Sequence, residues 1–434
     1  MTALSLPATL PITPVGHPLS ASVRVPGSKS LTNRALLVAA LAEGTTTLSN
    51  ALDSDDAHLF AGALAELGFR LVRRPPSVIE VTGLGGRIPA ARAQLFVGNA
   101  GTAARFLTAL LTLGRGEYTL DGDARMRQRP IADLLGALTQ LGARVESPTG
   151  CPPVRVTASG LPGGRATVAG EVSSQFLSGL LMVAPYAAAP VELFVERELN
   201  SRPYVDMTLA VMSDFGVAVE RDGYERFRTS PQRYQPRAEY AIESDASAAS
   251  YFFAAPAICG GRVRVQNISR RSRQGDLAFL DVLARMGCSI VEGDNWIEVA
   301  GPPPGQLRGV EVDLRDLPDT APTLAAMAPF AATFTTIRGI ASARVKESDR
   351  VAALCAELAR LGVAVEERPD GLVIQPCPFI HPASVKTYND HRMAMAFALV
   401  GLRVPGVVIE NPDCVSKTFP AYFEVLEQLR PSTL

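Results

Sequence analysis

The sequence predicts an α/β protein of two similar domains, each with three repeated units that place helices inside and sheets outside. Three observations lead to this fold class: the length of 434 residues, a short phrase that occurs five times at nearly constant spacing, and an apolar helix ahead of each occurrence.

Chain length favours more than one domain. A single hydrophobic core stops growing at about 250–300 residues, so a chain of 434 residues is expected to divide into two. Apolar residues make up 47% of the sequence, which is ample material for two cores.

The recurring phrase is an apolar residue, then Gly, then an alternating apolar stretch, and it closes a helical pattern. Its glycines are Gly68, Gly142, Gly216, Gly287 and Gly362, separated by 74, 74, 71 and 75 residues. A sixth copy is expected to end near Leu429 without its glycine. Solenoids and propellers repeat at about 20–50 residues, so this longer period predicts a different architecture.

Each unit is predicted to contain two helices of different character. The glycine lies where a helix C-cap requires a left-handed residue, and the helix before it is amphipathic, as in 56–67 and 349–361. The alternation after the glycine predicts half-buried strands at 69–72, 143–146, 217–220, 288–291 and 363–366. A second helix further upstream is apolar almost all round, which is typical of a helix buried on every side. These buried helices are expected at 35–42, 105–113, 176–184, 251–258, 323–331 and 393–402.

Six such units divide naturally into two sets of three. The break between the sets is expected in the polar, proline-containing stretch 228–245. We therefore assign residues 26–243 to one domain and residues 1–25 with 244–434 to the other, with hinges near Pro26 and Asp245. The active site is expected in the cleft between these domains.

Charge and composition exclude several classes of function. The formal net charge of −1 argues against general nucleic-acid or membrane-surface binding, because both need a broad excess of one sign. The apolar run 176–195 is interrupted by Pro185, Pro190 and Glu192, so it favours a buried helix followed by a strand over a membrane span. The six cysteines form no Cys-x-x-Cys pair, and the first ten residues lack the cationic start of a secretory signal. We expect a cytoplasmic monomer with reduced thiols.

Polar residues cluster where each buried helix begins, in the segments 26–34, 98–105, 170–175, 243–250, 317–322 and 388–392. Helix capping is a sufficient explanation for any one of these segments. Free amide groups and the helix dipole also make a helix start suitable for binding an anion. Cations lie at or beside these starts, among them Lys29, Arg34, Arg105 and Arg392. On a nearly neutral chain, this local concentration of positive charge predicts an anionic ligand.

Motifs for nucleotides and metals are poorly matched. The segment PGSKS (26–30) lacks the first glycine that a phosphate-binding loop needs at its required spacing. The sequence has neither Gly-x-Gly-x-x-Gly after a predicted strand nor His-Glu-x-x-His, and it contains four histidines in all. Dinucleotide and zinc chemistry therefore have no support.

A series of motifs resembles a known family. The motifs are GSKSLTNRALLVAAL, DSDD, GNAGTA, RPI, GEVSSQFLSGLL, SRPYVDMT, SDASAASYF, RVKESDR and YNDHRMAMAF followed by KTFP. Their order from residue 26 to 420 is similar to that of EPSP synthases. The resemblance implies two domains of three βαβαββ units each, an inside-out α/β barrel.

The resemblance also implies a reaction and its participants. EPSP synthases transfer the enolpyruvyl group of phosphoenolpyruvate to the 5-hydroxyl of shikimate 3-phosphate and release phosphate, in chorismate and aromatic amino acid biosynthesis. They use neither a metal nor a cofactor. Each substrate carries a carboxylate and a phosphate, which accounts for the many cations, since charge-assisted hydrogen bonds suit such groups.

Site residues follow from matching these motifs residue by residue. Shikimate 3-phosphate is expected to bind Ser30, Arg34, Ser173, Ser174, Gln175, Ser201, Tyr204, Asp319, Ser342 and Lys346. Phosphoenolpyruvate is expected to bind Lys29, Gly101, Thr102, Arg129, Arg350, Arg392 and Lys417. The catalytic residues are expected to be Lys29, which stabilises charge, Asp319, the base toward the hydroxyl, and Glu347, which exchanges a proton with C3 of phosphoenolpyruvate.

Two positions depart from the family pattern. Ser342 stands where some members have an Asn that contacts the shikimate phosphate, and Phe106 stands where many have Pro. Because Gly101 lacks a side chain that would crowd a phosphoenolpyruvate mimic, we expect glyphosate to inhibit.

Two rival functions remain open at this point. The sister enzymes that act on UDP-N-acetylglucosamine usually carry a reactive cysteine in the loop that corresponds to 123–130, where this chain has RMRQRP and no Cys. The other rival is a non-catalytic repeat scaffold that binds anions or proteins. Release of phosphate when shikimate 3-phosphate is supplied separates the three functions.

Overall fold

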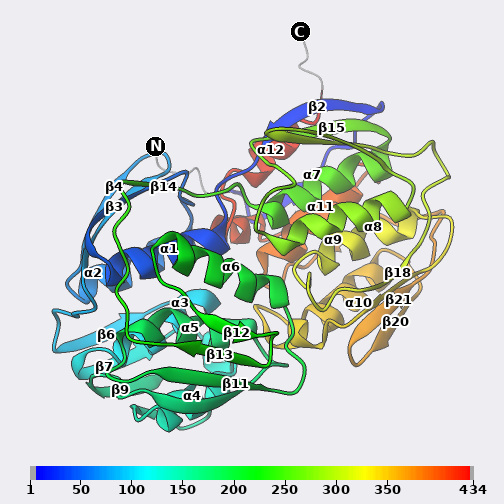
Figure 1. Ribbon diagram of the computed structural model, residues 1–434. Helices are drawn as coiled ribbons and strands as arrows, with labels where there is room; N and C mark the ends of the chain where they lie inside the picture. Colours follow the sequence, from blue (N-terminus) through cyan, green and yellow to red (C-terminus); the bar gives the residue numbers. More distant parts are fainter. Residues whose placement is uncertain (1–5, 431–434) are drawn as a thin grey trace. The chain divides into compact units, whose positions relative to one another are not determined.

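The chain divides into two compact units in the computed structural model, which describes residues 6–430. The continuous unit is Gly27–Glu243, and the split unit combines Met1–Pro26 with Ser244–Leu434. Each unit contains three repeats, which Figure 1 shows as helices lined by strands.

The continuous unit is built from three repeats of the same kind. The first comprises β14 (Glu239–Ala241), α1 (Lys29–Leu41), β3 (Glu43–Ser49), α2 (Asp55–Glu66), β4 (Arg70–Arg74) and β5 (Val78–Leu84). The second comprises β6 (Arg92–Phe96), α3 (Gly101–Leu111), β7 (Arg115–Asp121), α4 (Ala132–Gln140), β8 (Arg144–Glu146) and β9 (Val154–Ser159). The third comprises β10 (Gly164–Ala169), α5 (Ser174–Val183), β11 (Val191–Glu196), α6 (Arg202–Asp214), β12 (Glu220–Asp222) and β13 (Arg226–Thr229).

The split unit repeats this pattern. Its first repeat comprises β2 (Leu19–Arg24), α7 (Ala246–Cys259), β15 (Gly261–Gln266), α8 (Phe279–Arg285), β16 (Ser289–Gly293) and β17 (Trp296–Ala300). The second comprises β18 (Glu311–Asp313), α9 (Ala321–Met327), β19 (Thr335–Arg338), α10 (Arg350–Arg360), β20 (Val365–Arg368) and β21 (Gly371–Ile374). The last comprises β22 (Ser384–Val385), α11 (His391–Gly401), β23 (Val408–Glu410), α12 (Tyr422–Glu427) and β1 (Thr9–Pro11).

Among residues 6–430, one strand topology recurs in five of the six sheets. In the five four-stranded sheets the first strand of a repeat is parallel to the second, the fourth is antiparallel to the second, and the third pairs at the outside of the fourth. The sixth sheet, β1-β23-β22, has three strands, with β1 antiparallel to β23. The predicted βαβαββ repeat and the α/β fold class are therefore confirmed.

The first repeat of each unit takes its first strand from a distant part of the chain, and this strand pairing was not predicted. The first repeat of the continuous unit takes its first strand, β14, from the end of that unit, where β14 runs parallel to β3. The N-terminal strand β2 instead completes a sheet of the split unit beside β15. Backbone hydrogen bonds close both units at these points, from Ser28 N to Glu243 O (2.8 Å) and from Asp245 N to Pro26 O (2.8 Å). Pro26 thus belongs to the split unit.

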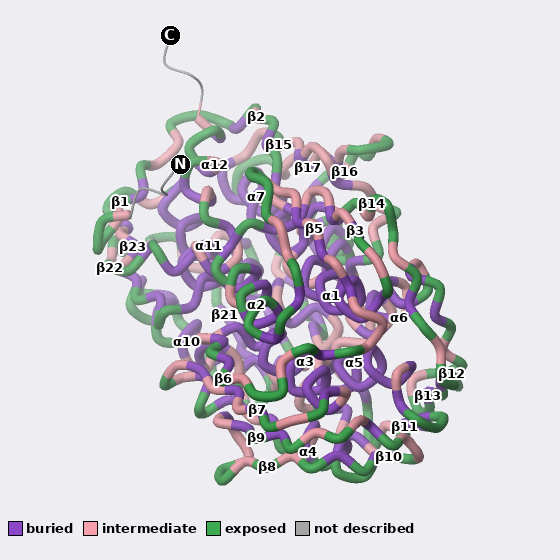
Figure 2. Tube along the Cα trace, turned by 90° about the vertical axis from the view of Figure 1, so that its left-hand side faces the viewer, coloured by how far each residue is buried: buried purple, intermediate pink, exposed green. Residues whose placement is uncertain are grey.

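The apolar helices form the interior of each unit, as their composition predicts. All fourteen residues of α7 are buried, and α3 is buried along its full length. Figure 2 shows the same contrast, with α1, α3 and α5 largely purple and the sheet strands mostly pink and green. Each buried helix begins two to six residues earlier than its apolar run, because part of the polar capping segment belongs to the first turn of the helix.

The repeated glycines close the outer helices in the predicted conformation. Gly68, Gly142, Gly216, Gly287 and Gly362 have φ values of 93°, 89°, 85°, 104° and 81°. These values lie in the region that favours glycine, so the predicted C-caps are confirmed.

One predicted strand is wrong in its position. Residues 217–219 are not in a strand, and β12 begins at Glu220. The side chain of Gln232 satisfies the backbone of Ala218 instead: Ala218 N donates to Gln232 Oε1 (3.1 Å), and Gln232 Nε2 donates to Ala218 O (2.9 Å). A side chain that takes both backbone groups of one residue removes the need for a strand partner there.

A pair of glycine substitutions tests where α2 ends: Gly62 lies inside the helix, and Gly68 follows it in a left-handed conformation. Gly62→Ala lies at an exposed position inside α2 with open space around the added methyl, and we expect about 0.5–1 kcal/mol of stabilisation. Gly68→Ala puts a side chain at φ 93° with its Cβ 2.7 Å from Pro89 Cβ, and we expect roughly 1–2 kcal/mol of destabilisation. Urea unfolding midpoints measure both, and shifts of the same sign would contradict the assignment.

No helix among the described residues is both long and apolar enough to cross a membrane. The six cysteines are all unpaired, and four of them, Cys259, Cys288, Cys355 and Cys414, are buried.

Candidate functional site

In the split unit, three cations meet at one carboxylate. Asp319 lies just before α9, and its Oδ1 accepts hydrogen bonds from Lys346 Nζ (2.6 Å) and Arg350 Nη1 (3.1 Å). Its Oδ2 accepts from Arg392 Nη2 (2.7 Å). The three donors come from three places: the segment before α10, the first turn of α10 and the first turn of α11. Packing of these helix starts therefore creates the cluster.

Arg350 holds the cluster together. Its Nε donates to Asp390 Oδ2 (2.8 Å), and its Nη2 donates to Asp390 Oδ1 (3.2 Å) and to Glu347 Oε2 (2.9 Å). The side chain is 2% exposed. Burial alone disfavours the charged guanidinium, but the carboxylates of Asp390, Glu347 and Asp319 outweigh it and raise the pKa of Arg350 above its usual value. This arginine is permanently charged.

The cluster is electrically balanced by its own side chains. Lys346, Arg350 and Arg392 carry positive charge, and Asp319, Glu347 and Asp390 carry negative charge. Removing one partner of a buried pair leaves an uncompensated charge, so each member depends on the others. Asp390 has a further role, because it caps α11 by accepting from Arg392 N (3.0 Å).

A second group of cations lies in the continuous unit. Lys29, the first residue of α1, has its Nζ 3.9 Å from Oδ2 of the buried Asp56. Ser28 caps the same helix by accepting from Leu31 N. The ammonium is therefore held close to the start of α1, where the helix dipole favours an anion.

Gly101 and Arg129 are in direct contact. A Cβ at Gly101 would lie 2.3 Å from Arg129 Nη2 and 2.8 Å from its Cζ. The Arg129 guanidinium is anchored through Nη1, which donates to Asn99 O and Asn99 Oδ1 (both 2.9 Å). Gly101 is thus required by the close approach of the guanidinium to the start of α3.

Arg34 differs from the other predicted anion ligands. Its guanidinium donates to Thr208 Oγ1 (2.7 Å), Ser30 O (2.9 Å), Tyr204 O (3.0 Å) and Ser178 Oγ (3.4 Å). It also lies over the ring of Phe106, with 5.4 Å from Cζ to the centroid. Burial lowers its pKa to about 10. Since these neutral acceptors use most of its five N–H groups, Arg34 joins α1, α5 and α6, and its contact with a carboxylate stays a prediction.

The remaining predicted residues of the continuous unit lie at other helix starts. Ser173 caps α5 by accepting from Gln175 N (3.2 Å), and Ser174 begins that helix. Ser201 occupies the N-cap position of α6 in a left-handed conformation (φ 59°), and Tyr204 lies in the first turn of that helix. Thr102 is buried in the first turn of α3. These residues share their placement at helix N-termini.

The Asp319 cluster is the set of side chains that the hydrogen bonds given above connect. Two predicted residues of the split unit, Ser342 and Lys417, are not part of that set. Ser342 is in a short 3-10 helix (Ala341–Val345) that ends just before Lys346. Lys417 is the last residue of another 3-10 helix (Pro412–Lys417) and is buried. Their roles as substrate ligands stay predictions.

Three residues that support these groups were not predicted. Asp390 is the most important, because it receives two hydrogen bonds from Arg350 and caps α11. Asn99 anchors Arg129, and Asp56 faces Lys29. All three lie in motifs already described, YNDHR, GNAGTA and DSDD. The sequence feature that could have revealed them is an acidic or amide residue in the same motif as, or close to, a predicted ligand.

Arg105 has a structural role at the start of α3. Its Nη1 donates to Gly101 O (3.2 Å), and its Nη2 donates to Pro130 O (2.9 Å). The side chain thereby connects Gly101 to the segment that carries Arg129.

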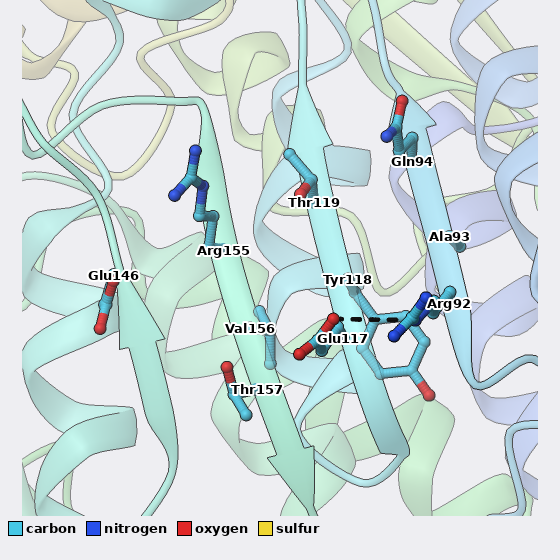
Figure 3. A pocket seen from close by; sticks show the side chains of 10 residues that line it. All are labelled: Arg92, Ala93, Gln94, Glu117, Tyr118, Thr119, Glu146, Arg155, Val156 and Thr157. Carbon is cyan, nitrogen blue, oxygen red and sulfur yellow. Dashed lines mark ion pairs between the residues drawn. The ribbon is translucent and has the colours of Figure 1, made fainter.

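A hollow of about 740 Å³ lies elsewhere, on the outer face of the sheet β6-β7-β9-β8. Figure 3 shows its ten lining side chains, including the ion pair of Arg92 Nε with Glu117 (3.7 Å). None of the predicted site residues lines it. In the part of the chain that the structure describes, no group of three His, Cys, Asp or Glu side chains is arranged to hold a metal ion.

The fold is shared with proteins of known structure. The repeated α/β architecture is also found in solved structures of enolpyruvyl transferases. An EPSP synthase from Acinetobacter baumannii has a TM-score of 0.80 at 24% identity, covering 97% of this chain and 98% of that one. The enolpyruvyl transferase NikO from Streptomyces tendae has a TM-score of 0.75 at 19% identity, covering 97% of each chain.

Sequence comparison then identifies the family. The family profile of EPSP synthase (3-phosphoshikimate 1-carboxyvinyltransferase) matches residues 14–426. A 3-phosphoshikimate 1-carboxyvinyltransferase of Nostoc punctiforme is 50% identical over 428 residues, 97% of this chain and 100% of the relative. One from a Shewanella species is 50% identical over 414 residues, 94% of this chain and 96% of the relative. This chain belongs to the EPSP synthase family.

Proposed function

We propose that the cation groups of both units serve one active site, in which shikimate 3-phosphate and phosphoenolpyruvate react. The reaction transfers the enolpyruvyl group of phosphoenolpyruvate to the 5-hydroxyl of shikimate 3-phosphate and releases phosphate. The observation that carries the proposal is the Asp319 cluster, which brings a carboxylate, a second carboxylate at Glu347 and three cations together at adjoining helix starts.

The chemistry is an addition followed by an elimination. In the addition, the 5-hydroxyl oxygen of shikimate 3-phosphate bonds to C2 of phosphoenolpyruvate while Asp319 takes the hydroxyl proton. At the same time C3 of phosphoenolpyruvate gains a proton and becomes a methyl group. Elimination then removes a methyl proton and breaks the bond between C2 and the phosphate oxygen. Glu347 exchanges the proton with C3 in both steps, and Lys29 stabilises the charge on the departing phosphate.

Ligand assignments are those that the family motifs imply. Phosphoenolpyruvate binds the strong cations Arg129, Arg350 and Arg392, with Lys29, Lys417 and the amide groups at Gly101 and Thr102. Shikimate 3-phosphate binds Lys346 and Asp319 together with the helix-start residues of the continuous unit, Ser30, Arg34, Ser173, Ser174, Gln175, Ser201 and Tyr204, and with Ser342. Arg350 is held by three carboxylates, which favours a rigid anion site over a flexible one.

A coupled assay tests the function directly. Purified protein is given phosphoenolpyruvate with shikimate 3-phosphate, with UDP-N-acetylglucosamine, or alone, and released phosphate is measured. Phosphate release with shikimate 3-phosphate alone among the acceptors is expected. Release with UDP-N-acetylglucosamine, or no release in any arm, would overturn the proposal.

Gly101→Ala tests the phosphoenolpyruvate subsite. Because the added Cβ would lie 2.3 Å from Arg129 Nη2, the guanidinium must move, and a displacement of about 1 Å can cost up to ~10²-fold in rate. We expect kcat/KM for phosphoenolpyruvate to fall roughly 10- to 100-fold, with glyphosate inhibition weakened in parallel. Gly136→Ala, where the added methyl meets open space in α4, is the matched control. Unchanged kinetics for Gly101→Ala would remove Arg129 from this subsite.

The protein is further proposed to act as a cytoplasmic monomer. Its six cysteines are unpaired, which is usual in a reducing compartment. Burial raises the pKa of Cys259, Cys288 and Cys414 to about 12, so these thiols are weak nucleophiles. Light scattering of the purified chain is expected to give a mass near 46.0 kDa. A mass of twice that value would contradict the monomer.

A further inference from the structure

A buried carboxylate on α10 lies outside the Asp319 cluster. Glu357 has no solvent exposure, yet it accepts three hydrogen bonds. Arg360 Nε donates to its Oε2 (2.9 Å), the backbone Lys386 N donates to the same oxygen (3.0 Å), and Tyr388 Oη donates to its Oε1 (2.7 Å). Two of the three donors, Lys386 and Tyr388, belong to a turn that ends at Asp390, so the carboxylate is directed at that turn.

This turn, residues 386–390, has an unusual backbone. Tyr388 and Asn389 are consecutive non-glycine residues with φ of 55° each. A side chain disfavours this region, so neighbouring contacts must hold the conformation in place. Burial and the hydrogen bond to Glu357 raise the pKa of Tyr388 to about 12, which keeps its hydroxyl protonated and able to donate.

One helix holds both ends of the turn. Arg350 and Glu357 are seven residues apart on α10, about two helical turns, and therefore lie on the same face. Arg350 bonds the carboxylate of Asp390 at the end of the turn, while Glu357 bonds Lys386 N and Tyr388 Oη at its beginning. The Arg350 guanidinium binds an acceptor of the turn and the Glu357 carboxylate binds donors of the turn. Because the two groups cannot be interchanged, they fix the position of the turn along α10.

A third contact joins the turn to the segment that carries Lys417. Asn411 Nδ2 donates to Asn389 Oδ1 (3.1 Å), and Asn411 occupies the N-cap position of the 3-10 helix Pro412–Lys417. Asn411 itself has φ of 48°. The turn thus connects α10, the start of α11 and the Lys417 helix.

We propose that Glu357 is a positioning residue, which sets the placement of Asp390 and Arg392 by holding the turn 386–390 on α10. It touches no substrate in this scheme. Its effect reaches the reaction through Arg392, whose guanidinium must meet Asp319 and the phosphoenolpyruvate anion at the same time. The expected effect on kinetics rests on the proposed function. The clamp, by which we mean the hydrogen bonds from Lys386 N and Tyr388 Oη to Glu357, lies within the split unit and does not depend on that function.

Kinetics of three variants test the role. Glu357→Ala removes all three contacts, Glu357→Gln keeps an oxygen that accepts from Lys386 N, and Tyr388→Phe removes one hydroxyl. We expect KM for phosphoenolpyruvate to rise roughly 10- to 100-fold for Glu357→Ala, with Glu357→Gln and Tyr388→Phe in between. KM for shikimate 3-phosphate stays within about threefold, because that ligand set lies mainly in the continuous unit. A general loss of stability would lower the active fraction and hence kcat, and would leave both KM values unchanged.

Glu427→Gln is the matched control. Glu427 pairs with Arg430 at the same spacing as Glu357 with Arg360, but its side chain is 56% exposed. Wild-type KM values are expected for this variant, because exposed pairs contribute little.

Hydrogen exchange separates failure of the clamp from failure of the proposed function. The Lys386 amide is expected to exchange at least about tenfold faster in Glu357→Ala than in the wild type, whether or not the enzyme releases phosphate. Unchanged exchange together with unchanged KM in Tyr388→Phe and Glu357→Gln would overturn the inference, and these two mild variants serve if Glu357→Ala does not fold. A wild-type enzyme without activity would reject the function and leave the exchange result to judge the clamp.

Discussion

Glu347→Gln is expected to lower turnover by about 10²- to 10⁴-fold, the range associated with loss of a proton-transferring group. The Glu347 side chain is 7% exposed, and Oε2 accepts from Arg350 Nη2 at 2.9 Å. A glutamine can still accept that hydrogen bond, so the cluster keeps its shape. It cannot take and return a proton, which lowers kcat. It also leaves the cluster with one uncompensated positive charge, so KM for the two anionic substrates should stay the same or fall.

Isotope exchange makes this prediction specific. In D₂O and with shikimate 3-phosphate present, the wild-type enzyme should exchange the C3 protons of phosphoenolpyruvate with solvent, because addition forms a methyl group reversibly. Glu347→Gln should lose this exchange in step with turnover. Glu367→Gln, an exposed position on β20 that pairs with Arg344, provides the control. Exchange at the wild-type rate in Glu347→Gln would assign the proton transfer to another group.

Asp319→Asn is expected to have two effects. The variant loses the base toward the hydroxyl, so kcat falls by at least about 10²-fold. It also removes one of three carboxylates that balance three cations, which leaves the cluster with a net positive charge. The N–H groups of Lys346, Arg350 and Arg392 that donate to the Asp319 carboxylate in the wild type can then donate to a bound anion. We therefore expect KM for the two anionic substrates to stay the same or fall while kcat collapses.

Steady-state kinetics with each substrate varied in turn measures this split. Asp313→Asn is a suitable control, because Asp313 is also paired with arginine but is exposed at the surface of the split unit. A large rise in KM with kcat preserved would show that Asp319 acts only in binding. Melting temperatures with and without inorganic phosphate add a second check, since an anion is expected to stabilise Asp319→Asn more than the wild type.

Local features of the fold could be predicted with good accuracy. The five glycines that end outer helices all have positive φ, and the apolar runs all lie in buried helices. Both signals are short-range: a left-handed residue is needed where a helix stops, and a helix without a polar face has to be covered. The misplaced strand at 217–220 shows the limit, because Gln232, fourteen residues from Ala218, determines the backbone partners there.

The sequence could predict which residues belong to the candidate site, but it predicted less well which groups surround each of them. Asp319, Lys346, Glu347, Arg350 and Arg392 were all proposed as members of one site, and in the split unit they form one connected network of hydrogen bonds. Arg34 was grouped with them by motif, yet its environment is a set of neutral acceptors. A motif identifies which residue is required, whereas only packing shows what surrounds it.

By itself the sequence determined the family, the sixfold repeat and the residue types at the helix starts, because these depend on order and spacing along the chain. Tertiary structure alone decided that β14 pairs with β3 and β2 with β15, that Asp390 joins Arg350, and that Glu357 accepts from Tyr388 in the turn before Arg392. Each of these is a pairing between residues far apart in sequence or between side chains on different elements. Such pairings follow from the shape of the packed core, and no local pattern encodes them.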